Sequence, residues 1–290
     1  MPSQHKLAIA LSGGKDSMGM VIALKDFQNI VAITVDHRLR PTSTQEALQV
    51  QKWMMALNIP HVILTWEHDG IDTDIQNKAR IARYDLMTTW CLTHNVPYLI
   101  TAHHLEDQVE TFFMRLSKGS GLKGLGAIHE VTRYNNITIL RPFLTLPQTV
   151  LHTYSQNHPF IDDPSNYNPI FERVKFRELT KHYLTLDPHA HILKTITKLQ
   201  ETDRYLDDQI QHISYHQLLE LDYVLFERVI HRMFQDQYPF KSKKVRILYD
   251  RLKDPHVHIT TFAHHIFKKT KEGIEIVKED REPSRHPGAI

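Results

Sequence analysis

The chain has 290 residues, 41% of them hydrophobic and 23% charged, which is the composition of a soluble globular protein with one or two domains. Its single cysteine excludes an intrachain disulfide and a zinc site built from several cysteines. The net charge of +2 at pH 7 does not decide whether the partner is a polyanion. No segment approaches the roughly 20 apolar residues of a membrane span, and the N-terminus lacks the apolar core of a signal peptide. We therefore expect a cytoplasmic protein without a membrane segment.

The first 150 residues alternate between short apolar segments and longer segments with helical spacing. The apolar segments predict five buried strands, at residues 6–12, 30–37, 61–68, 96–104 and 137–144. Between them, apolar residues recur at three- and four-residue steps and predict helices over 42–58, 75–95 and 105–116. Ser43 and Glu46 have the spacing of a capping box at the start of the first of these helices.

Strands that alternate with helices predict an α/β fold with a doubly wound, mostly parallel sheet. In such a sheet, ligands bind beyond the carboxyl ends of the strands. After about residue 150 the sequence becomes more polar and helical. We therefore predict a catalytic domain at 1–165 and a smaller, mostly helical domain at 166–290.

A polar turn, SGGKDS, follows the first predicted strand and precedes an apolar helical segment. Glycines let the backbone approach an anion, and a helix N-terminus directs unpaired N–H groups at it. Asp16 is the unusual member, because a carboxylate beside a phosphate is repulsive unless a cation intervenes. Mg²⁺, or hydrogen bonds that orient the turn, would explain it, and a plain helix cap is the alternative to a binding role. The predicted phosphate loop consists of Ser12, Gly13, Gly14, Lys15, Asp16 and Ser17.

This turn fits neither GxxxxGK[ST] nor GxGxxG. It resembles the SGGxDS loop of the N-type ATP pyrophosphatases, which hold the leaving pyrophosphate there and transfer AMP to an acceptor. Four further stretches, with their order and spacing, resemble the tRNA(Ile)-lysidine synthetase family, and the resemblance runs from about Lys6 to Arg177. They are VDHRLRPTSTQEA, ARIARYDLM, TAHHLEDQVETFFMRLSKGSGLKGLGAI and DDPSNYNPIFERVKFR.

The resemblance implies a fold, a reaction and a set of partners. ATP, with Mg²⁺, would adenylate the 2-carbonyl oxygen of the wobble cytidine in an isoleucine tRNA with a CAU anticodon. The side-chain amine of free lysine would then displace AMP and give lysidine. The implied ATP-binding residues are those of the SGGKDS turn, and the implied catalytic residues are Asp36, Arg83, Asp107 and Glu110.

Two of these positions have plain alternatives. Asp36 ends a predicted strand, where it would act on a metal or a proton at the adenylation centre, or else brace the loop. Arg80 and Arg83 share a helical face and suit phosphate or carboxylate binding, or else are solvated surface arginines.

Asp107 and Glu110 lie three residues apart at the start of a predicted helix, directly after His103 and His104. Two carboxylates on one face can hold a lysine ammonium and later accept its proton. We therefore predict that Asp107, Glu110 and His104 bind lysine. A metal site is a competing interpretation, as is the preference of acids for a first helical turn. The family has an Asp-Asp pair where this chain has Glu106 and Asp107.

Basic residues outside this region are candidates for tRNA binding. Arg115 and Lys118 precede a glycine-rich stretch that we expect to be a mobile loop over the site. Residues 241–271 hold nine Lys or Arg and two Asp, and such a stretch attracts RNA phosphates or is simply a solvated face. The predicted tRNA-binding residues are Arg115, Lys118, Arg173, Arg177, Lys243 and Lys244.

Three alternatives to a lysidine ligase remain at this point. A tRNA 2-thiolation enzyme shares the loop but normally needs paired cysteines. A small-molecule synthetase would form an acyl-adenylate, and a catalytically silent protein would only bind nucleotide or RNA. The metal ligands and the oligomeric state are left open, with a homodimer among the options.

Overall fold

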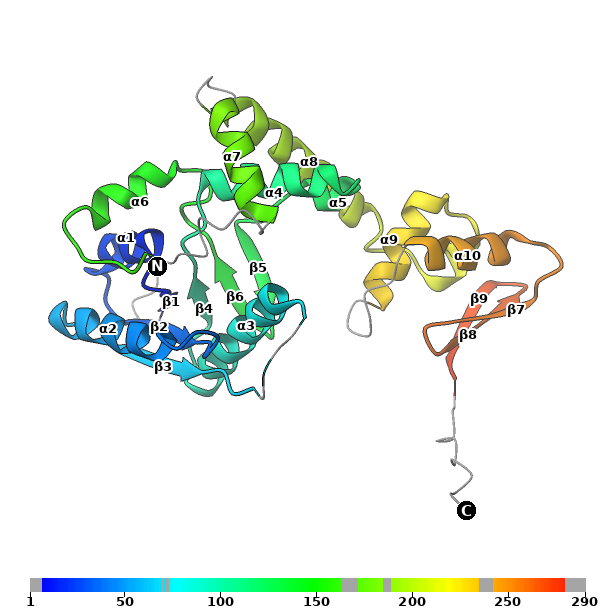
Figure 1. The fold of residues 1–290 in the computed structure, drawn as a ribbon. Coiled ribbons are helices and arrows are strands. Elements are labelled where there is room, and N and C mark those ends of the chain that lie inside the picture. The colour runs from blue at the N-terminus through cyan, green and yellow to red at the C-terminus, as the bar shows by residue number, and fades with distance from the viewer. Residues whose placement is uncertain are drawn as a thin grey trace, which may run out of the picture. The chain divides into compact units, whose positions relative to one another are not determined.

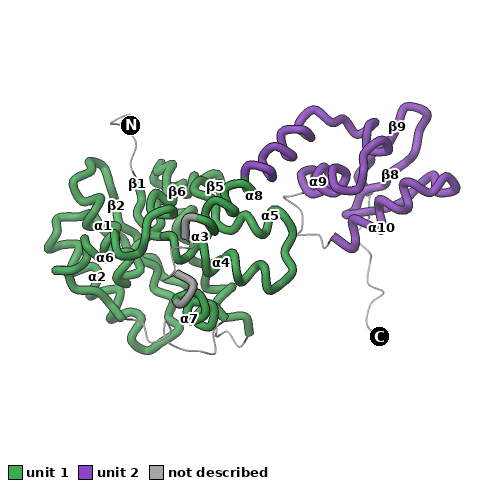
Figure 2. Tube along the Cα trace, turned by 90° about the horizontal axis from the view of Figure 1, so that it is seen from above, with its two compact units in different colours: residues 1–200 green, residues 201–290 purple. Residues whose placement is uncertain are grey.

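The structure is a computed structural model that describes residues 7–68, 70, 73–162, 172–184, 189–234 and 242–279. The chain forms two compact units, residues 1–200 and 201–290 (Figure 2). The sequence predicted a domain boundary after residue 165. In the structure, helix α7 (Glu172–Leu184) and the first half of α8 (His189–Gln209) lie beyond that residue but within the N-terminal unit. The assignment of catalysis to one part and tRNA recognition to the other stays a prediction.

The N-terminal unit contains a six-stranded sheet with the strand order β3-β2-β1-β4-β6-β5 (Figure 1). Every neighbouring pair is parallel except β5 and β6. The predicted doubly wound, mostly parallel sheet is therefore confirmed. The strands are β1 (Leu7–Ala10), β2 (Ile30–Asp36), β3 (His61–Thr65), β4 (Tyr98–Ile100), β5 (Val131–Tyr134) and β6 (Ile137–Leu140).

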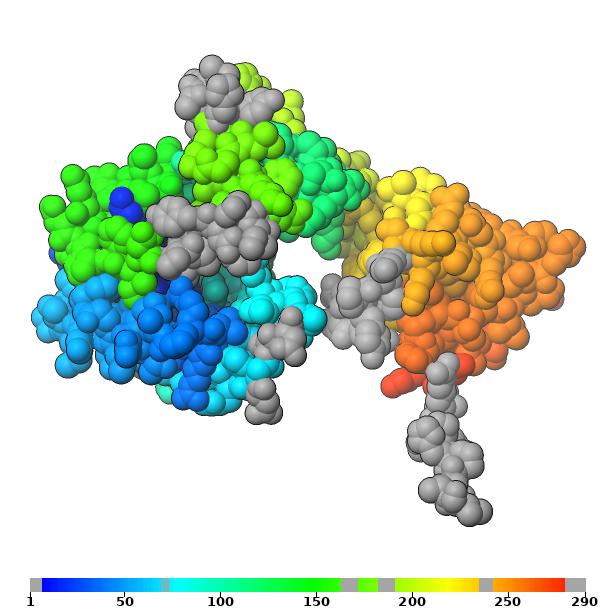
Figure 3. All heavy atoms as spheres, in the orientation of Figure 1, coloured from blue at the N-terminus to red at the C-terminus, as the bar shows by residue number. Residues whose placement is uncertain are grey.

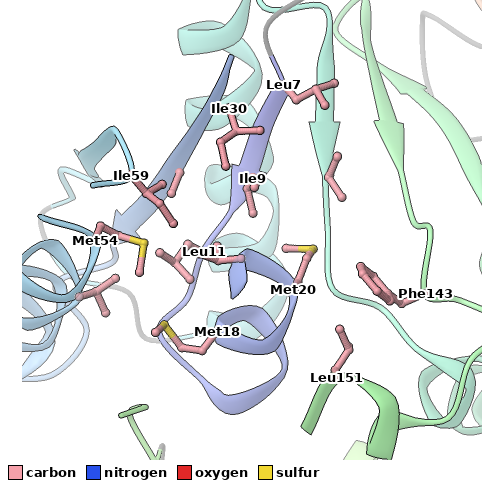
Figure 4. Packing of buried hydrophobic residues seen from close by; sticks show 14 residues of the cluster. Leu7, Ile9, Leu11, Met18, Met20, Ile30, Met54, Ile59, Phe143 and Leu151 are labelled. Carbon is pink, nitrogen blue, oxygen red and sulfur yellow. The ribbon is translucent and has the colours of Figure 1, made fainter. Parts of the chain in front are cut away.

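Helices cover both faces of this sheet because strand side chains alternate between its two faces. Leu7, Ile9 and Leu11 lie in one apolar cluster with α1 (Lys15–Leu24), α2 (Ser43–Ala56) and α6 (Gln148–Ser155) (Figure 4). Ala8 belongs to a second cluster, which contains Tyr84, Met87 and Cys91 of α3 (Ile75–Thr93). The sheet is thus buried on both sides, as its nearly continuous apolar strands require.

Helices α1 and α6 cross unusually closely at Gly19. A Cβ atom built on Gly19 would lie 2.2 Å from the backbone oxygen of Leu151, so no larger residue fits without moving a helix. The glycine therefore sets the position of α6 beside the first turn of α1. This contact explains why a glycine stands in the apolar part of α1.

Strands β1 and β4 are neighbours, but the chain leaves them in opposite directions. From β1 it continues to β2 and β3 on one side, and from β4 to β6 and β5 on the other. Such a switch point opens a crevice at the carboxyl ends of the two strands, where α/β sheets bind ligands. The SGGKDS turn follows β1, and helix α4 (Leu105–Ser117) follows β4. The predicted phosphate loop and the predicted acidic pair therefore come to the same edge of the sheet.

Helix α7 packs on α4, and so does the short helix α5 (Leu122–Leu125) (Figure 1). No helix in the part of the chain that the structure describes has both the length and the apolar character needed to cross a bilayer.

The C-terminal unit has its own core, so it does not depend on the first sheet for burial. It comprises the 3-10 helix η2 (Tyr215–Leu219), helices α9 (Tyr223–Met233) and α10 (Ser242–Lys253), and an antiparallel sheet of β7 (Ile259–Phe262), β8 (His265–Thr270) and β9 (Gly273–Lys278). Phe226 and Phe267 are its largest fully buried side chains. The sequence predicted a mostly helical region and missed this sheet.

Candidate functional site

The SGGKDS turn is closed on itself by its two serines. The hydroxyl of Ser17 donates to the carbonyl of Gly14 at 3.0 Å and accepts from the backbone N–H of Ser12 at 3.2 Å. The two serine oxygens lie 3.0 Å apart. Gly13 has φ of 82°, and a Cβ atom there would lie 2.5 Å from Cγ2 of Val50. The loop therefore needs a glycine at this position both for its conformation and for space.

Residues 160–161, which are far from the phosphate loop in the sequence, lie against it in the structure. The backbone N–H of Ile161 donates to the carbonyl of Gly13 at 2.9 Å. The ammonium of Lys15 lies 5.6 Å from the centre of the Phe160 ring. These contacts join residues 160–161 to the loop and place an aromatic ring beside the lysine predicted to meet phosphate.

Asp16 is held by hydrogen-bond donors from α6. Its Oδ1 atom accepts from Nε2 of Gln148 at 3.0 Å and pairs with Nε2 of His152 at 2.8 Å, and its Oδ2 atom lies 3.7 Å from Nε2 of His104. Burial alone would raise the pKa of Asp16, but the contacts with His104, Gln148 and His152 lower it to about 2. Asp16 is thus an ionised carboxylate that fixes the loop to two other helices.

The same geometry does not fit a Mg²⁺ ion held by Asp16. Imidazole and amide N–H groups, which repel a cation, surround its carboxylate. Among the described residues, no three His, Cys, Asp or Glu side chains are grouped so that they could hold a metal ion. Of the two explanations left open for Asp16, the hydrogen-bonding one matches this arrangement, and the predicted use of Mg²⁺ stays a prediction.

His104 is a buried cation between three carboxylates. Its Nδ1 atom lies 2.9 Å from Oε2 of Glu106, and its Nε2 atom lies 3.5 Å from Oδ2 of Asp107 and 3.7 Å from Oδ2 of Asp16. Burial would lower the pKa of His104, but these carboxylates outweigh it and raise the pKa to about 10. A positive imidazolium repels a lysine ammonium, so His104 could act on lysine only through its neighbour Asp107. The role of His104 in lysine binding stays a prediction.

His103 has the opposite electrostatic character. Its Nδ1 atom lies 2.7 Å from the hydroxyl of Thr101. Burial lowers the pKa of His103 to about 3. The negative charge of Asp107 opposes this effect, and the positive charges of Arg141, Arg80 and Arg173 add to it. Two adjacent histidines therefore carry different charges at neutral pH, one neutral and one positive.

Asp107 and Glu110 share one face of α4, as the sequence predicted. The evidence is that both contact the guanidinium group of Arg173. Nη2 of Arg173 lies 2.5 Å from Oδ1 of Asp107, and its Nε lies 2.8 Å from Oε2 of Glu110. Nε of Arg177 lies 2.7 Å from Oε1 of Glu110. The Glu110 side chain is only 2% exposed. The predicted lysine-binding acids and two predicted tRNA-binding arginines are thus paired with each other.

Residues 2–183 match the family model described as the PP-loop domain. The chain belongs to this family. The SGGKDS turn is then its PP-loop, at the switch point of the sheet.

Relatives and a solved structure are similar over parts of the chain. The tRNA(Ile)-lysidine synthase of Orientia tsutsugamushi is 41% identical over 186 residues, which are 62% of this chain and 42% of that protein. That of Zymomonas mobilis is 40% identical over 214 residues, 71% of this chain and 64% of that protein. The chain therefore spans less than two thirds of the length of these relatives. A U34-tRNA thiolase from Methanococcus maripaludis shares the fold, with a TM-score of 0.58 and 18% identity over 73% of this chain and 74% of that one.

Two predicted RNA-binding residues of α4 have protein partners. Nη1 of Arg115 donates to the carbonyls of Gly124 and Ala127, both at 2.8 Å. Lys118 forms an ion pair with Glu172 of α7. The glycine-rich stretch, expected as a mobile loop, therefore contains α5 and is fastened to α4. Contacts of Arg115 and Lys118 with tRNA stay predictions.

Asp36 braces the turn between β2 and α2. It accepts from the backbone N–H of Arg38 at 3.0 Å and from the hydroxyl of Thr44 at 2.6 Å. The neighbouring His37 accepts from Nε of Arg83 at 3.2 Å, which brings Arg83 of α3 beside the residue that follows Asp36. Bracing, one of the two interpretations of Asp36, matches these bonds, and its catalytic role stays a prediction.

Sequence reasoning missed the residues of α6 and the role of Glu106. Glu106 accepts from the backbone N–H of Gln148 at 2.8 Å, which ties the start of α6 to the start of α4. No local pattern around Gln148 or His152 points to Asp16, because the contact depends on the α1–α6 packing.

Lys243 and Lys244, two predicted tRNA-binding residues, are exposed on α10 of the C-terminal unit. The DPSN segment at 163–166 lies outside the described residues.

Proposed function

We propose that this PP-loop protein is an ATP-dependent ligase that converts the wobble cytidine of a CAU-anticodon isoleucine tRNA to lysidine. The observation that carries the proposal is the meeting of the PP-loop and the Asp107–Glu110 pair at one switch point, joined through His104. The names of the curated relatives, over about two thirds of this chain, support the same reaction.

In the first step the PP-loop would receive the triphosphate of ATP. The free N–H groups at the start of α1 and the ammonium of Lys15 would bind the phosphates. A bond forms between the cytidine 2-oxygen and the α-phosphorus, and the bond from that phosphorus to the bridging oxygen breaks. Pyrophosphate leaves, and it would stay on the loop until release.

In the second step the side-chain amine of lysine attacks C2 of the adenylated cytidine. The ammonium first loses one proton to become the attacking amine; the C2–oxygen bond then breaks, AMP leaves with that oxygen, and the nitrogen loses a second proton. Asp107 and Glu110 would hold the ammonium beforehand and accept a proton as the new bond forms. The Asp107 and Glu110 side chains are only 13% and 2% exposed, which strengthens this attraction because water screens it little.

The tRNA has to present its cytidine unstacked, because a paired or stacked base cannot meet both the PP-loop and the amine. Exposed Lys243 and Lys244 would bind the phosphate backbone, with the salt dependence that such contacts carry.

The direct test is a reaction of purified protein with ATP, labelled lysine and an unmodified isoleucine tRNA transcript. We expect one lysine in each tRNA, with one AMP and one pyrophosphate formed per lysine. A transcript with uridine at the wobble position is the matched control and should stay unlabelled. ATP consumption with no label in the cytidine transcript would contradict the proposal.

Thiolation of tRNA is the alternative that the shared fold raises, and Cys91 counts against it. The Cys91 side chain is fully buried against the sheet, and burial raises the pKa of its thiol to about 11. A thiol that stays protonated and shielded is a poor sulfur carrier.

A further inference from the structure

The amine site that we propose is already filled by cations of the same chain. Three nitrogen atoms of Arg173 and Arg177 lie 2.5 to 2.8 Å from oxygens of Asp107 and Glu110. Both oxygens of Glu110 are engaged, and its side chain is 2% exposed. A lysine ammonium therefore finds no free carboxylate oxygen on Glu110 while α7 holds this position.

Charge balance leads to the same conclusion. The two guanidinium groups neutralise Asp107 and Glu110, while the positive His104, 3.5 Å from Asp107, is balanced by its own carboxylate partners Glu106 and Asp16. An additional ammonium at the Asp107–Glu110 pair would lie beside two guanidinium groups that already neutralise it, which is unfavourable in a partly buried site. The lysine can enter favourably only if at least one arginine leaves its carboxylate.

An arginine that leaves needs another anion, and RNA supplies one of suitable shape. A guanidinium group binds a phosphate through two parallel N–H bonds, as it binds a carboxylate. The side chains of Arg173 and Arg177 are 38% and 36% exposed, so part of each remains open to solvent. Helix α7 packs on α4 and lies at the surface (Figure 3). Lys175 on this helix is also exposed.

We propose that Arg173 and Arg177 hold the amine site in a self-paired state and that substrates bind by exchanging these ion pairs. The lysine ammonium takes the carboxylates of Asp107 and Glu110, and the two guanidinium groups turn to phosphates of the RNA. This inference rests on the proposed function and adds a coupling to it. Each substrate removes the competitor of the other, so lysine and tRNA bind cooperatively, and the coupling is reciprocal.

The decisive variant is Arg173→Gln with Arg177→Gln, which removes both positive charges and keeps polar side chains. Lysine binding in the absence of RNA is measured by calorimetry. If the arginines compete with the ammonium, the double variant binds lysine about 10-fold more tightly than the wild-type protein. A purely structural role of the ion pairs, or a role of the arginines in holding lysine, predicts weaker binding.

The second measurement is the linkage between substrates. Saturating lysine should tighten binding of the tRNA transcript to the wild-type protein by about 10-fold, and this factor should fall towards one in the double variant. Lys175→Gln is the matched control, because it removes an exposed charge from the same helix but not from the carboxylate cluster. It should leave lysine affinity and the coupling factor unchanged.

Three results would overturn the proposal: weaker lysine binding in a folded double variant, an undiminished coupling factor, or the same gain in Lys175→Gln. Near-ultraviolet circular dichroism establishes folding. If the double variant does not fold, Arg177→Gln alone serves, since it frees one oxygen of Glu110 and should show the gain in part. Failure of lysine to enter tRNA would contradict the proposed function, whereas tighter lysine binding in the variant would still support the exchange.

Discussion

Substitution of Gly19 by alanine tests the link between helix packing and the PP-loop. The added methyl group would lie 2.2 Å from the carbonyl oxygen of Leu151, and these are backbone atoms that no rotamer change can move. Helix α6 must therefore withdraw by about 1 Å to restore an ordinary contact. Because Gln148 and His152 lie on α6, the withdrawal also stretches their bonds to Asp16.

The magnitude follows from three contributions. Overpacking of this kind destabilises by about 1–3 kcal/mol. Two hydrogen bonds to a carboxylate are weakened, and since Asp16 is about one third exposed we assign about 1 kcal/mol to each. Alanine returns about 1 kcal/mol through its helix propensity. We expect a net loss of about 3 kcal/mol in the free energy of unfolding, or a melting midpoint lower by roughly 10 °C.

The assay is thermal unfolding together with titration of ATP, where a distorted loop should weaken affinity by about 10-fold or more. Gly121→Ala is the matched control, because nothing lies within 4 Å of a Cβ atom at Gly121. It should leave both the melting midpoint and ATP affinity close to wild type. If Gly19→Ala melts no lower than Gly121→Ala, the inferred role of this crossing is wrong.

Three further predictions concern single residues. Gly13→Ala forces a methyl group to 2.5 Å from Val50 at φ of 82°, so ATP affinity measured by titration should fall at least about 10-fold. His104 has a folded-state pKa of about 10 against a usual value of 6.5, so its stabilisation is complete below about pH 6.5 and is lost as pH rises through 10. Urea midpoints should therefore decline over this range in the wild-type protein and decline less in His104→Gln, and equal slopes would contradict the assignment. The fully buried thiol of Cys91 should react with a thiol reagent only at the rate of unfolding, and Cys91→Ala should keep ligase activity.

Five of the six strands of the first sheet were predictable because each is a short apolar run flanked by polar residues. Strand β5 (VTRY) was missed because it is not an apolar run, although the tight turn at Asn135 and Asn136, whose φ values are 46° and 62°, was a usable signal of its pairing with β6. The hairpin between β7 and β8 turns at Ala263 and His264, again with positive φ. Asparagine pairs signal such turns, whereas Ala-His does not.

The start of helix α2 was predicted almost correctly, but the hydrogen bonds at that start are not the predicted ones. The expected capping box began at Ser43, but the helix is preceded by Thr42, whose hydroxyl donates to Oε1 of Glu46 at 2.8 Å. Glu46 also pairs with Arg40. The predicted helix start was therefore nearly right, although the bonds that secure it were not.

The site divides in the same way between local and distant determinants. The PP-loop and the Asp107–Glu110 pair were predictable, because each is complete within a few residues of chain. The pairing of that acidic pair with Arg173 was not, because it requires α7 to pack on α4. The two histidines at 103 and 104 look equivalent in the sequence, and only their surroundings give them opposite charge states.

The bonds from Asp16 to α6 have a consequence for synthesis of the protein on the ribosome. Asp16 is separated from Gln148 by 132 residues and from His152 by 136. At elongation rates of about 5–20 residues per second, the first βα turn is synthesised on the order of ten seconds before these two side chains. A nucleotide that meets the growing chain during this interval encounters an unbraced turn, so competent binding has to wait for nearly half of the polypeptide to follow.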